Sequence, residues 1–160
     1  MHPSCLVEAE RFKRDYLASL PPFLSVGDVG SYDVNGSLRQ VFSEYVYTGL
    51  DVVPGPNVDM VLPDAYLWEE VKQFDVVVSA NTAEHVKRVW DWARSLASIL
   101  RPGGLLWLHS AGLSIGYHEN PVDCWRFYPE GMRTLLEYAG LEVLEAFYAP
   151  LDTIGIARKP

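Results

Sequence analysis

The chain alternates short apolar runs with longer stretches in which apolar residues recur every three or four positions. Residues 1–20 follow the second pattern, and Pro21 and Pro22 come directly after them. Apolar residues at this spacing line one face of a helix, and a proline pair ends it. We therefore expect an amphipathic helix over residues 1–20, packed on the edge of a sheet. Its apolar face is formed by Leu6, Ala9, Phe12, Tyr16 and Leu20.

Several later runs are short and rich in β-branched or other apolar residues, which is typical of strands. They lie at residues 25–29, 47–51, 58–62, 74–79, 105–109, 143–148 and 153–158. Helical spacing is found in the stretches that begin near residue 37 and that cover residues 66–72, 86–100 and 129–139. The helix over 86–100 has the clearest apolar stripe, which places Trp90 among the core-facing residues.

Strands and helices alternate through most of the chain, and the run at 74–79 is apolar almost without interruption. Such a run indicates a parallel strand that is covered on both faces, and the alternation indicates a parallel-rich sheet between helices. A length of 160 residues suits one domain. The fold class that we predict is therefore α/β, a single doubly wound, Rossmann-like domain over residues 1–160.

The first predicted strand ends in an acid-x-Gly turn at Asp28 and Gly30, the place where doubly wound proteins receive nucleotide-like ligands. A pyrophosphate-binding loop needs a second glycine two residues later, but Tyr32 and Asp33 follow here. A bulky ring and a negative charge are poor neighbours for phosphates. The loop therefore favours a nucleoside without phosphates, and its carboxylates favour a cationic one.

Two further acids follow strand-like runs. Asp51 lies about twenty residues beyond Gly30, the spacing at which an acid meets ribose hydroxyls. Asp64 and Ala65 follow the third run, where a carboxylate can accept a hydrogen bond from an adenine amino group. Taken singly, Asp28 could equally cap a turn and Asp51 could be a solvated loop residue; as a spaced pair they favour ligand binding.

Five motifs occur in order along the chain: DVGSYDVNG, YTGLD, PDAY, FDVVVSANTAEHV and LRPGGLLWLH. This set resembles the class I S-adenosylmethionine-dependent methyltransferases, with a departure from the family's D-x-G-x-G-x-G loop at Tyr32. The resemblance implies a mostly parallel seven-stranded sheet with an antiparallel last strand, and S-adenosylmethionine as cofactor. The cofactor-binding residues that we expect are Asp28, Gly30, Ser31, Tyr32, Asp33, Asn35, Asp51, Val52, Asp64, Ala65, Ala80 and Asn81.

Residues 110–127 form a connection that is long for so compact a domain, and unexplained length is usually functional. We predict a substrate-binding loop here. The residues that we expect to contact the acceptor are His85, Tyr117, Trp125 and Arg126. Deprotonation of an acceptor hydroxyl or amine would add a base to the mechanism, for which we propose His118 first, then His109 and Asp123. Two roles stay open for His118 and Asp123, catalysis and hydrogen bonding within the loop.

Composition narrows the choice of partner. The formal charge is −8 and the isoelectric point is near 4.9, which argues against bulk nucleic acid and anionic membranes as partners. Two cysteines build no disulfide framework, and we find neither a signal peptide nor an apolar run of membrane-spanning length. We expect a cytoplasmic protein with a small-molecule acceptor and possible self-association. The spacing of the histidines and acids predicts no metal site.

Three functions compete at this point. The first is transfer of a methyl group to an oxygen, nitrogen or carbon nucleophile of a small molecule. The second is a nucleoside-binding module without turnover, since so short a chain has little substrate cover. The third is a nicotinamide-dependent reductase, which Tyr32 and Asp33 disfavour.

Overall fold

The computed structural model describes residues 3–118 and 121–160. Its core is one seven-stranded sheet with the strand order β3-β2-β1-β4-β5-β7-β6. The strands are β1 (Ser25–Val29), β2 (Val46–Asp51), β3 (Met60–Val61), β4 (Phe74–Ala80), β5 (Leu100–Ala111), β6 (Glu142–Tyr148) and β7 (Asp152–Arg158). Strand β7 is antiparallel to both neighbours, β5 and β6, while the other pairs are parallel. The predicted fold class, with its antiparallel last strand, is confirmed.

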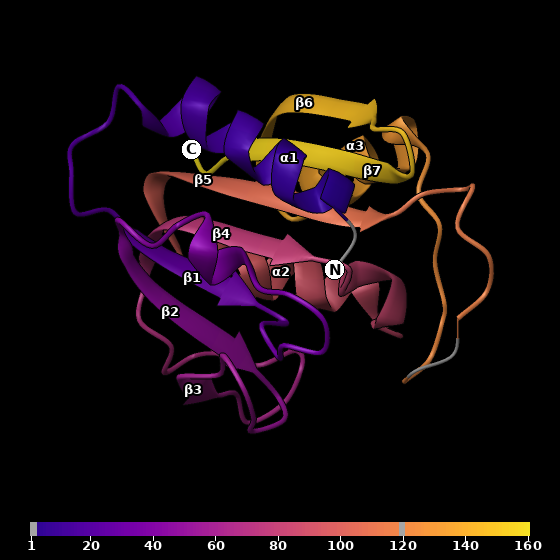
Figure 1. The fold of residues 1–160 in the computed structure, drawn as a ribbon, viewed down its shortest axis with the longest axis horizontal. Helices are drawn as coiled ribbons and strands as arrows, with labels where there is room; N and C mark the ends of the chain where they lie inside the picture. Colours follow the sequence, from indigo (N-terminus) through magenta and orange to yellow (C-terminus); the bar gives the residue numbers. More distant parts are fainter. Residues whose placement is uncertain (1–2, 119–120) are drawn as a thin grey trace.

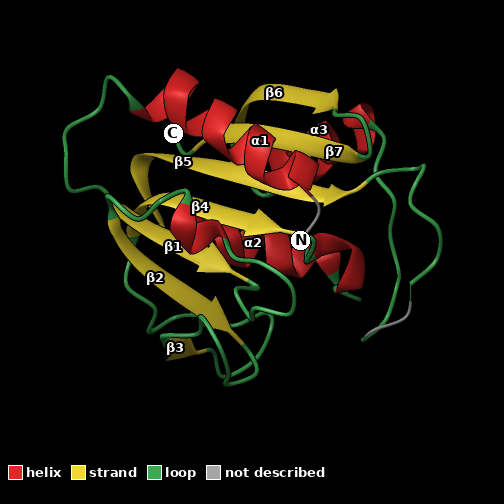
Figure 2. Ribbon diagram, viewed as in Figure 1, coloured by secondary structure: helices red, strands yellow, loops and turns green. Residues whose placement is uncertain are grey.

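Helices cover both faces of the sheet (Figures 1 and 2). Helix α1 (Pro3–Phe12) lies on one face, and α2 (Val89–Ser98) and α3 (Pro129–Tyr138) lie on the other. Alternate residues of β4 point to opposite layers: Val76 and Val78 pack with the α1 side, and Val77 packs with the α2 side. Burial on both faces explains why this strand is apolar almost throughout.

Helix α1 lies across the face of the sheet, and the edge position that we predicted for it is wrong. Its inner residues Cys5, Ala9 and Phe12 are buried, and the ring of Phe12 stacks on Trp107 of β5 at 6.3 Å between centroids. A π-helical turn, Lys13–Leu17, continues the helix towards the two prolines. The predicted boundary near Pro21 is therefore right to within a few residues.

Two predicted helices do not form. The segment after Gly36 contains only a short 3-10 turn, Leu38–Gln40, because β2 begins a few residues later and the Lys13 ammonium takes the Val41 carbonyl at 2.9 Å. Residues 66–72 form turns, since Asp64 binds the amides of Tyr66 and Leu67 at 2.5 and 2.7 Å. Such short segments gain too few helical bonds to repay nucleation.

Two details of the predicted 86–100 helix are also corrected. Helix α2 ends at Ser98, because Leu100 already pairs with Phe74 as the first residue of β5. Trp90 is 40% exposed and packs edge-on against Tyr138 of α3, whereas Trp92 is buried in the core. The predicted helix over 129–139 and the closing hairpin around residues 150–152 are confirmed as α3, β6 and β7.

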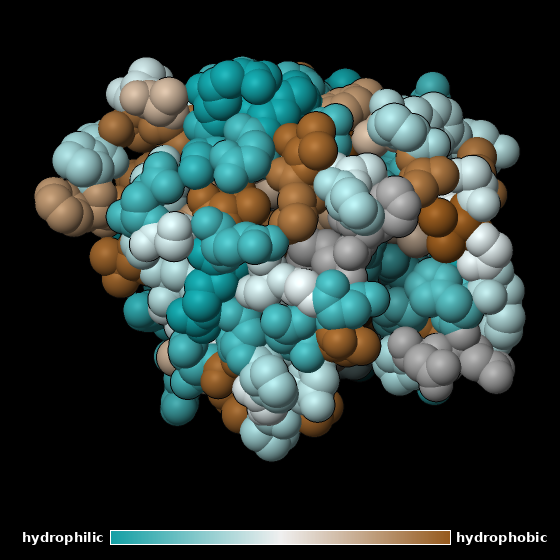
Figure 3. All heavy atoms as spheres, in the orientation of Figure 1, coloured by the Kyte–Doolittle hydropathy of each residue, from teal (hydrophilic) through white to brown (hydrophobic). Residues whose placement is uncertain are grey.

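The surface seen from the α1 side carries hydrophilic atoms over most of its area, with hydrophobic atoms in small separate groups (Figure 3). No helix in the described part of the chain has the length and apolarity needed to cross a bilayer. Cys5 is buried and Cys124 is exposed, and both are free thiols.

Candidate active site

The carboxyl ends of β1, β4 and β5 point to the same side of the molecule, where the loop that follows β5 also extends (Figure 1). Ligands of doubly wound sheets bind beyond this edge. The turn at its centre is Gly30, with φ of +80° and an amide that donates to the Leu50 carbonyl at 2.8 Å. A Cβ atom there would lie 2.1 Å from the Thr82 hydroxyl, so both conformation and packing require glycine.

Tyr32 turns away from the backbone of its own loop. Its ring lies against Gly55, where a Cβ atom would approach the ring to 2.2 Å. Its amide donates to the Asp51 carboxylate at 3.1 Å. Tyr32 therefore forms a wall of the site where a pyrophosphate-binding loop would have a glycine.

Asp28 is a buried carboxylic acid at the end of β1. Burial raises its pKa to about 7, although a hydrogen bond from the Tyr47 hydroxyl and the charge of Arg39 act in the opposite direction. Near neutral pH this group is close to its midpoint, so it can meet a ligand cation as a carboxylate. The Asp51 carboxylate also accepts from the Val53 amide at 3.1 Å, which holds the turn after β2.

Two adjoining cavities lie at this edge. The smaller has a volume of about 120 Å³ and is lined by Asp28, Gly30, Ser31, Tyr32, Val34, Asn35, Gly36, Ser37, Leu38, Ala80 and Asn81. The larger has a volume of about 600 Å³. Its lining is Val29, Gly30, Tyr32, Val34, Asp51, Val52, Val53, Leu62, Ala65, Tyr66, Trp68, Asn81, Thr82, His85, Val86, Lys87, Trp92, Pro121 and Val122. Gly30, Tyr32, Val34 and Asn81 line both, so the two cavities meet at the Gly30 turn.

The structure thus brings together ten of the twelve predicted cofactor residues around these cavities. Asp33 and Asp64 are absent from both linings and serve local turns. Asp33 accepts from the Gly36 amide at 2.7 Å. The amides of Tyr66 and Leu67 lower the pKa of Asp64 and hold it as a carboxylate in its turn.

His85 is the predicted acceptor residue that lines the larger cavity. It closes the 3-10 turn Ala83–His85 after β4, and its Nδ1 atom contacts the Val122 carbonyl across the cavity rim. A carbonyl only accepts, so Nδ1 carries the proton and Nε2 keeps its lone pair. Pro121 and Val122 also line this cavity, and the sequence pattern did not indicate them.

The other predicted residues of the loop are bonded to one another. Arg126 donates to the two carboxylate oxygens of Asp123 at 2.5 and 2.7 Å, and these bonds lower the pKa of Asp123 to about 2. The amide of His118 donates to the same carboxylate at 2.9 Å. Trp125 donates to the Val86 carbonyl at 2.8 Å and packs on the core. Tyr117 is 74% exposed and lies outside both cavity linings.

His109 lies inside the sheet and outside the cavities. It is fully buried on β5, its ring packs on Trp107, and its Nε2 atom is 3.2 Å from the Asp152 carboxylate. His109 does not line either cavity, so the structure places it in the core beside Asp152.

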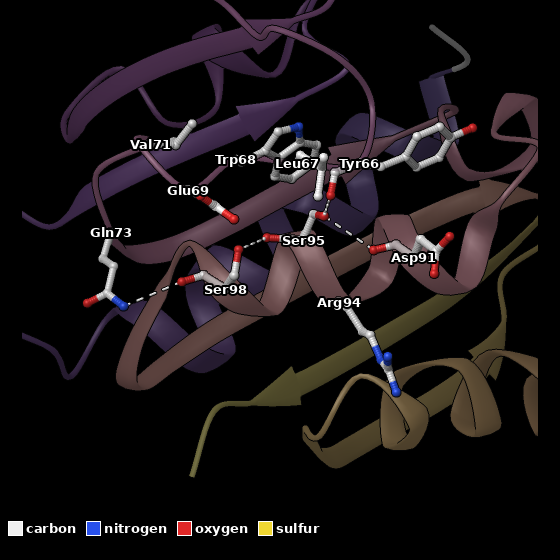
Figure 4. A pocket seen from close by; sticks show the side chains of 10 residues that line it. All are labelled: Tyr66, Leu67, Trp68, Glu69, Val71, Gln73, Asp91, Arg94, Ser95 and Ser98. Carbon is white, nitrogen blue, oxygen red and sulfur yellow. Dashed lines mark hydrogen bonds between the residues drawn. The ribbon is translucent and has the colours of Figure 1, made fainter.

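A further groove of about 590 Å³ lies between α2 and the segment 66–73 (Figure 4). Its polar side chains are engaged locally: Ser95 donates to the carbonyls of Tyr66 and Asp91, and Gln73 donates to the Ser98 carbonyl at 3.4 Å. This groove occupies the place where residues 66–72 were predicted to form a helix.

Comparison with known proteins supports the same family. A family model described as "Methyltransferase domain" matches residues 35–108. No curated protein matches the sequence.

The fold recurs in solved structures. An N1-methyltransferase from Burkholderia thailandensis, solved with 1,6-didemethyltoxoflavin and S-adenosylhomocysteine, is 17% identical with a TM-score of 0.76 over 96% of this chain and 77% of its own. The [4+2]-cyclase SpnF is 15% identical with a TM-score of 0.71, over 96% of this chain and 80% of its own. The N-methyltransferase NodS from Bradyrhizobium japonicum, solved with S-adenosylhomocysteine, is 15% identical with a TM-score of 0.70. The match covers 99% of this chain and 89% of NodS.

At these identities the structural likeness concerns the fold, whereas the family model matches the sequence itself. The matched segment contains Asp51 at the end of β2 and the turn after β4, two parts of the larger cavity. The family model covers just under half of the chain, and it agrees with the ordered motifs and the strand order in pointing to a methyltransferase domain similar to the class I S-adenosylmethionine-dependent methyltransferases.

Proposed function

We propose that this enzyme transfers the methyl group of S-adenosylmethionine to a small-molecule acceptor bound beneath the loop after β5. One observation carries the proposal: the cavity of about 600 Å³ is lined both by strand-end residues such as Gly30 and Asp51 and by Pro121 and Val122 of the loop. A cofactor on the strand ends and an acceptor under the loop would then share one cavity.

The reaction is a nucleophilic displacement. An oxygen, nitrogen or carbon atom of the acceptor attacks the methyl carbon, and the carbon–sulfur bond breaks with its electron pair passing to sulfur. The acceptor loses a proton, so the products are the methylated acceptor, S-adenosylhomocysteine and H⁺. Holding the nucleophile in line with the methyl group supplies much of the rate enhancement.

The residues divide between the two ligands. We propose that Asp51 binds the ribose and that Asp28 meets the cationic end of the cofactor, because both stand at strand ends on the cavities. His85 faces the acceptor. His118 lies beside it, with ring centroids 4.9 Å apart, and is the nearest of the proposed catalytic groups. Asp123 and His109 take positioning roles, because their contacts are with Arg126 and Asp152.

The test is a titration with S-adenosylhomocysteine by calorimetry. Asp51→Ala removes the carboxylate on the cavity wall, and we expect a loss of affinity of about 10- to 100-fold, the range for a hydrogen bond to a charged group. Asp64→Ala is the matched control, since Asp64 is a strand-end acid outside both cavity linings, and we expect affinity within twofold of wild type. Equal effects of the two substitutions would contradict the assignment.

Turnover is tested separately with radiolabelled S-adenosylmethionine and a panel of small hydroxyl, amine and activated-carbon acceptors. Labelled product supports methyl transfer. Cofactor binding without product from any acceptor class would instead support a binding module.

We further propose one cofactor-binding domain over residues 1–160, self-association and a cytoplasmic location. The support for the first is that the described strands form a single sheet. Sedimentation analysis of the purified chain tests self-association, and a single species at the monomer mass would contradict it.

A further inference from the structure

The turn after β4 and the loop after β5 bring together three side chains that are far apart in the sequence. Glu84, His85 and His118 each offer a carboxylate oxygen or ring nitrogen, and these atoms lie within 4.8 Å of one another. Two imidazoles and one carboxylate are the ligand set of many sites for divalent transition metals. From this cluster we propose a Zn²⁺-type metal site at the rim of the acceptor cavity, formed by Glu84, His85 and His118.

Glu84 supplies the first argument. Its side chain is fully buried, and its carboxylate accepts from the Ser110 hydroxyl at 2.9 Å and the Ala111 amide at 3.3 Å. Both donors are neutral, and among residues 3–118 and 121–160 no lysine or arginine forms an ion pair with Glu84. Arg126 acts on Glu84 only through its charge at a distance. A buried carboxylate without a direct ion-pair partner is costly, and a metal ion beside it would offset that cost.

The orientation of the imidazoles supplies the second argument. The Val122 carbonyl holds the Nδ1 proton of His85, which leaves Nε2 as a lone-pair donor. The Nδ1 atom of His118 lies 3.3 Å from the Gly116 oxygen and 3.2 Å from Nη2 of Arg126, so a metal on Nε2 requires the tautomer in which Nδ1 donates to the Gly116 carbonyl. Histidines that bind metals are usually oriented by such a second hydrogen bond on the other ring nitrogen.

The surroundings of His118 are compatible with a cation. Arg126 approaches its Nδ1 atom at 3.2 Å, but the two hydrogen bonds from Arg126 to Asp123 balance the guanidinium charge. Ligand atoms around Zn²⁺ lie about 3.3 Å apart, given bonds of about 2.0–2.2 Å. The ligand atoms of Glu84, His85 and His118 lie at most 4.8 Å apart, so they must approach one another by about 1.5 Å to bind Zn²⁺. His118 lies on a loop, where such a movement requires no change in a helix or strand.

The site has three protein ligands and one open direction towards the cavity that His85 lines. Three ligands plus an exchangeable position is the pattern of catalytic rather than structural zinc. This step rests on the proposed function: an acceptor hydroxyl or amine would bind the metal at the open position. The metal would lower the pKa of that group, its proton would pass to solvent, and the lone pair would attack the methyl carbon.

The experiment measures metal on the whole chain after treatment with a chelator and buffer exchange. We expect about one Zn²⁺ to rebind per chain, with Mg²⁺ failing to compete because Mg²⁺ prefers oxygen ligands. His118→Gln and Glu84→Gln should each weaken Zn²⁺ binding about 100-fold or more. A chain that retains no Zn²⁺, or a His118→Gln variant that binds as wild type does, would overturn the proposal.

Cys124→Ser is the matched control, because Cys124 is an exposed thiol whose amide donates to the Glu84 carbonyl at 2.7 Å. Of the two cysteines, Cys5 is less able than Cys124 to bind Zn²⁺ as a thiolate, since burial and the nearby Asp152 raise the pKa of its thiol. The control should keep full Zn²⁺ binding, and Co²⁺ bound in place of zinc should show no thiolate charge-transfer band. Loss of binding in Cys124→Ser would assign the metal to the cysteine and overturn the site.

Calorimetry with S-adenosylhomocysteine separates this proposal from the proposed function and reports folding of each variant. We expect cofactor affinity within about twofold in His118→Gln and after metal removal, because neither Glu84 nor His118 lines the strand-end cavities. If the protein binds Zn²⁺ but not S-adenosylhomocysteine, the result counts against the proposed function alone. Intact cofactor binding without zinc binding would count against the metal site alone.

Discussion

At the scale of single residues, the site depends on carboxylates in contrasting environments. Asp28 is buried and accepts from the Tyr47 hydroxyl, while Asp51 lines the larger cavity and accepts from the Tyr32 and Val53 amides. The same side-chain type therefore has different functions in the two places. Asp51 holds the geometry of the turn and lines the larger cavity, whereas burial raises the pKa of Asp28.

The raised pKa of Asp28 predicts a stability that falls as pH rises. Unfolded Asp ionises near 3.8, but the folded group holds its proton until about pH 7. Between these values the folded chain binds more protons than the unfolded chain, so unfolding becomes easier with increasing pH. A difference of three pH units corresponds to about 4 kcal/mol at most, because one unit is about 1.36 kcal/mol.

The check is urea denaturation of wild type and Asp28→Asn at pH 5 and pH 8. We expect the stability of the variant relative to wild type to be greater at pH 8 than at pH 5, since the amide never ionises. S-adenosylmethionine should show the reverse dependence, binding wild type more tightly at pH 8, when Asp28 is a carboxylate. A variant with the same pH slope as wild type would show that Asp28 is not the responsible group.

At the scale of elements, the described parts of the loop after β5, residues 112–118 and 121–128, are connected by the ion pair between Arg126 and Asp123. Arg126 bonds to Asp123 and to the carbonyls of Ile115, Gly116 and Trp125, so it joins both arms of the loop. The loop reaches the cavity through Pro121 and Val122, which have no such bonds of their own side chains.

Arg126→Ala should therefore release the loop while the core stays folded. We expect cleavage within residues 112–128 by a non-specific protease to become several-fold faster, with the thermal midpoint changed by no more than a few degrees. Arg133→Ala is the control, since Arg133 is on the surface of α3 and its ion pair with Glu137 spans 4.0 Å. Equal protection of the loop in both variants would mean that the ion pair does not hold it.

Element types were predictable where burial decides them. Strands β1, β4 and β7 are buried on both faces, so they occur in the sequence as short apolar runs. Helix α3 is buried along one side, so its apolar residues recur at helical spacing. The predictions of helices near residue 37 and over residues 66–72 were wrong, because the spacing of apolar residues does not reveal hydrogen bonds to the backbone. Lys13 and Asp64 hold those backbones in turns instead.

The site was predictable only in part for a similar reason. Strand-end acids such as Asp28 and Asp51 follow from topology, since parallel strands end at one edge. Which loop residue returns to that edge is set by tertiary packing, so Val122 carried no signal in the sequence. Nothing in the sequence pattern singled out Glu84, and only the structure shows that it is fully buried beside two histidines.

At the scale of the whole molecule, α1 is the main cover of one sheet face, while α2 and α3 share the other. Phe12 lies at the centre of the α1 side, fully buried between Tyr16 and Trp107. The sheet thus depends on an element far away in sequence from the strands that it covers.

Phe12→Ala should destabilise the fold by about 3–5 kcal/mol, the usual cost of removing a buried phenylalanine. Val7→Ala lies in the same helix with 65% of its side chain exposed, and we expect a change below about 0.5 kcal/mol. Denaturant unfolding monitored by circular dichroism measures both. Similar losses in the two variants would mean that helix propensity, not packing on Trp107, governs this face.

The contact between His85 and the Val122 carbonyl links the position of the proton on the imidazole to the position of the loop over the larger cavity. When the segment that contains Val122 moves outward, Nδ1 loses its acceptor and the ring is free to exchange tautomers, so the nitrogen aimed at the reaction space is no longer defined. If the acceptor binds beside His85, as proposed, the covered state alone presents Nε2 to it in one orientation. The open state would then leave a bound sulfonium exposed to water without a defined imidazole beside it.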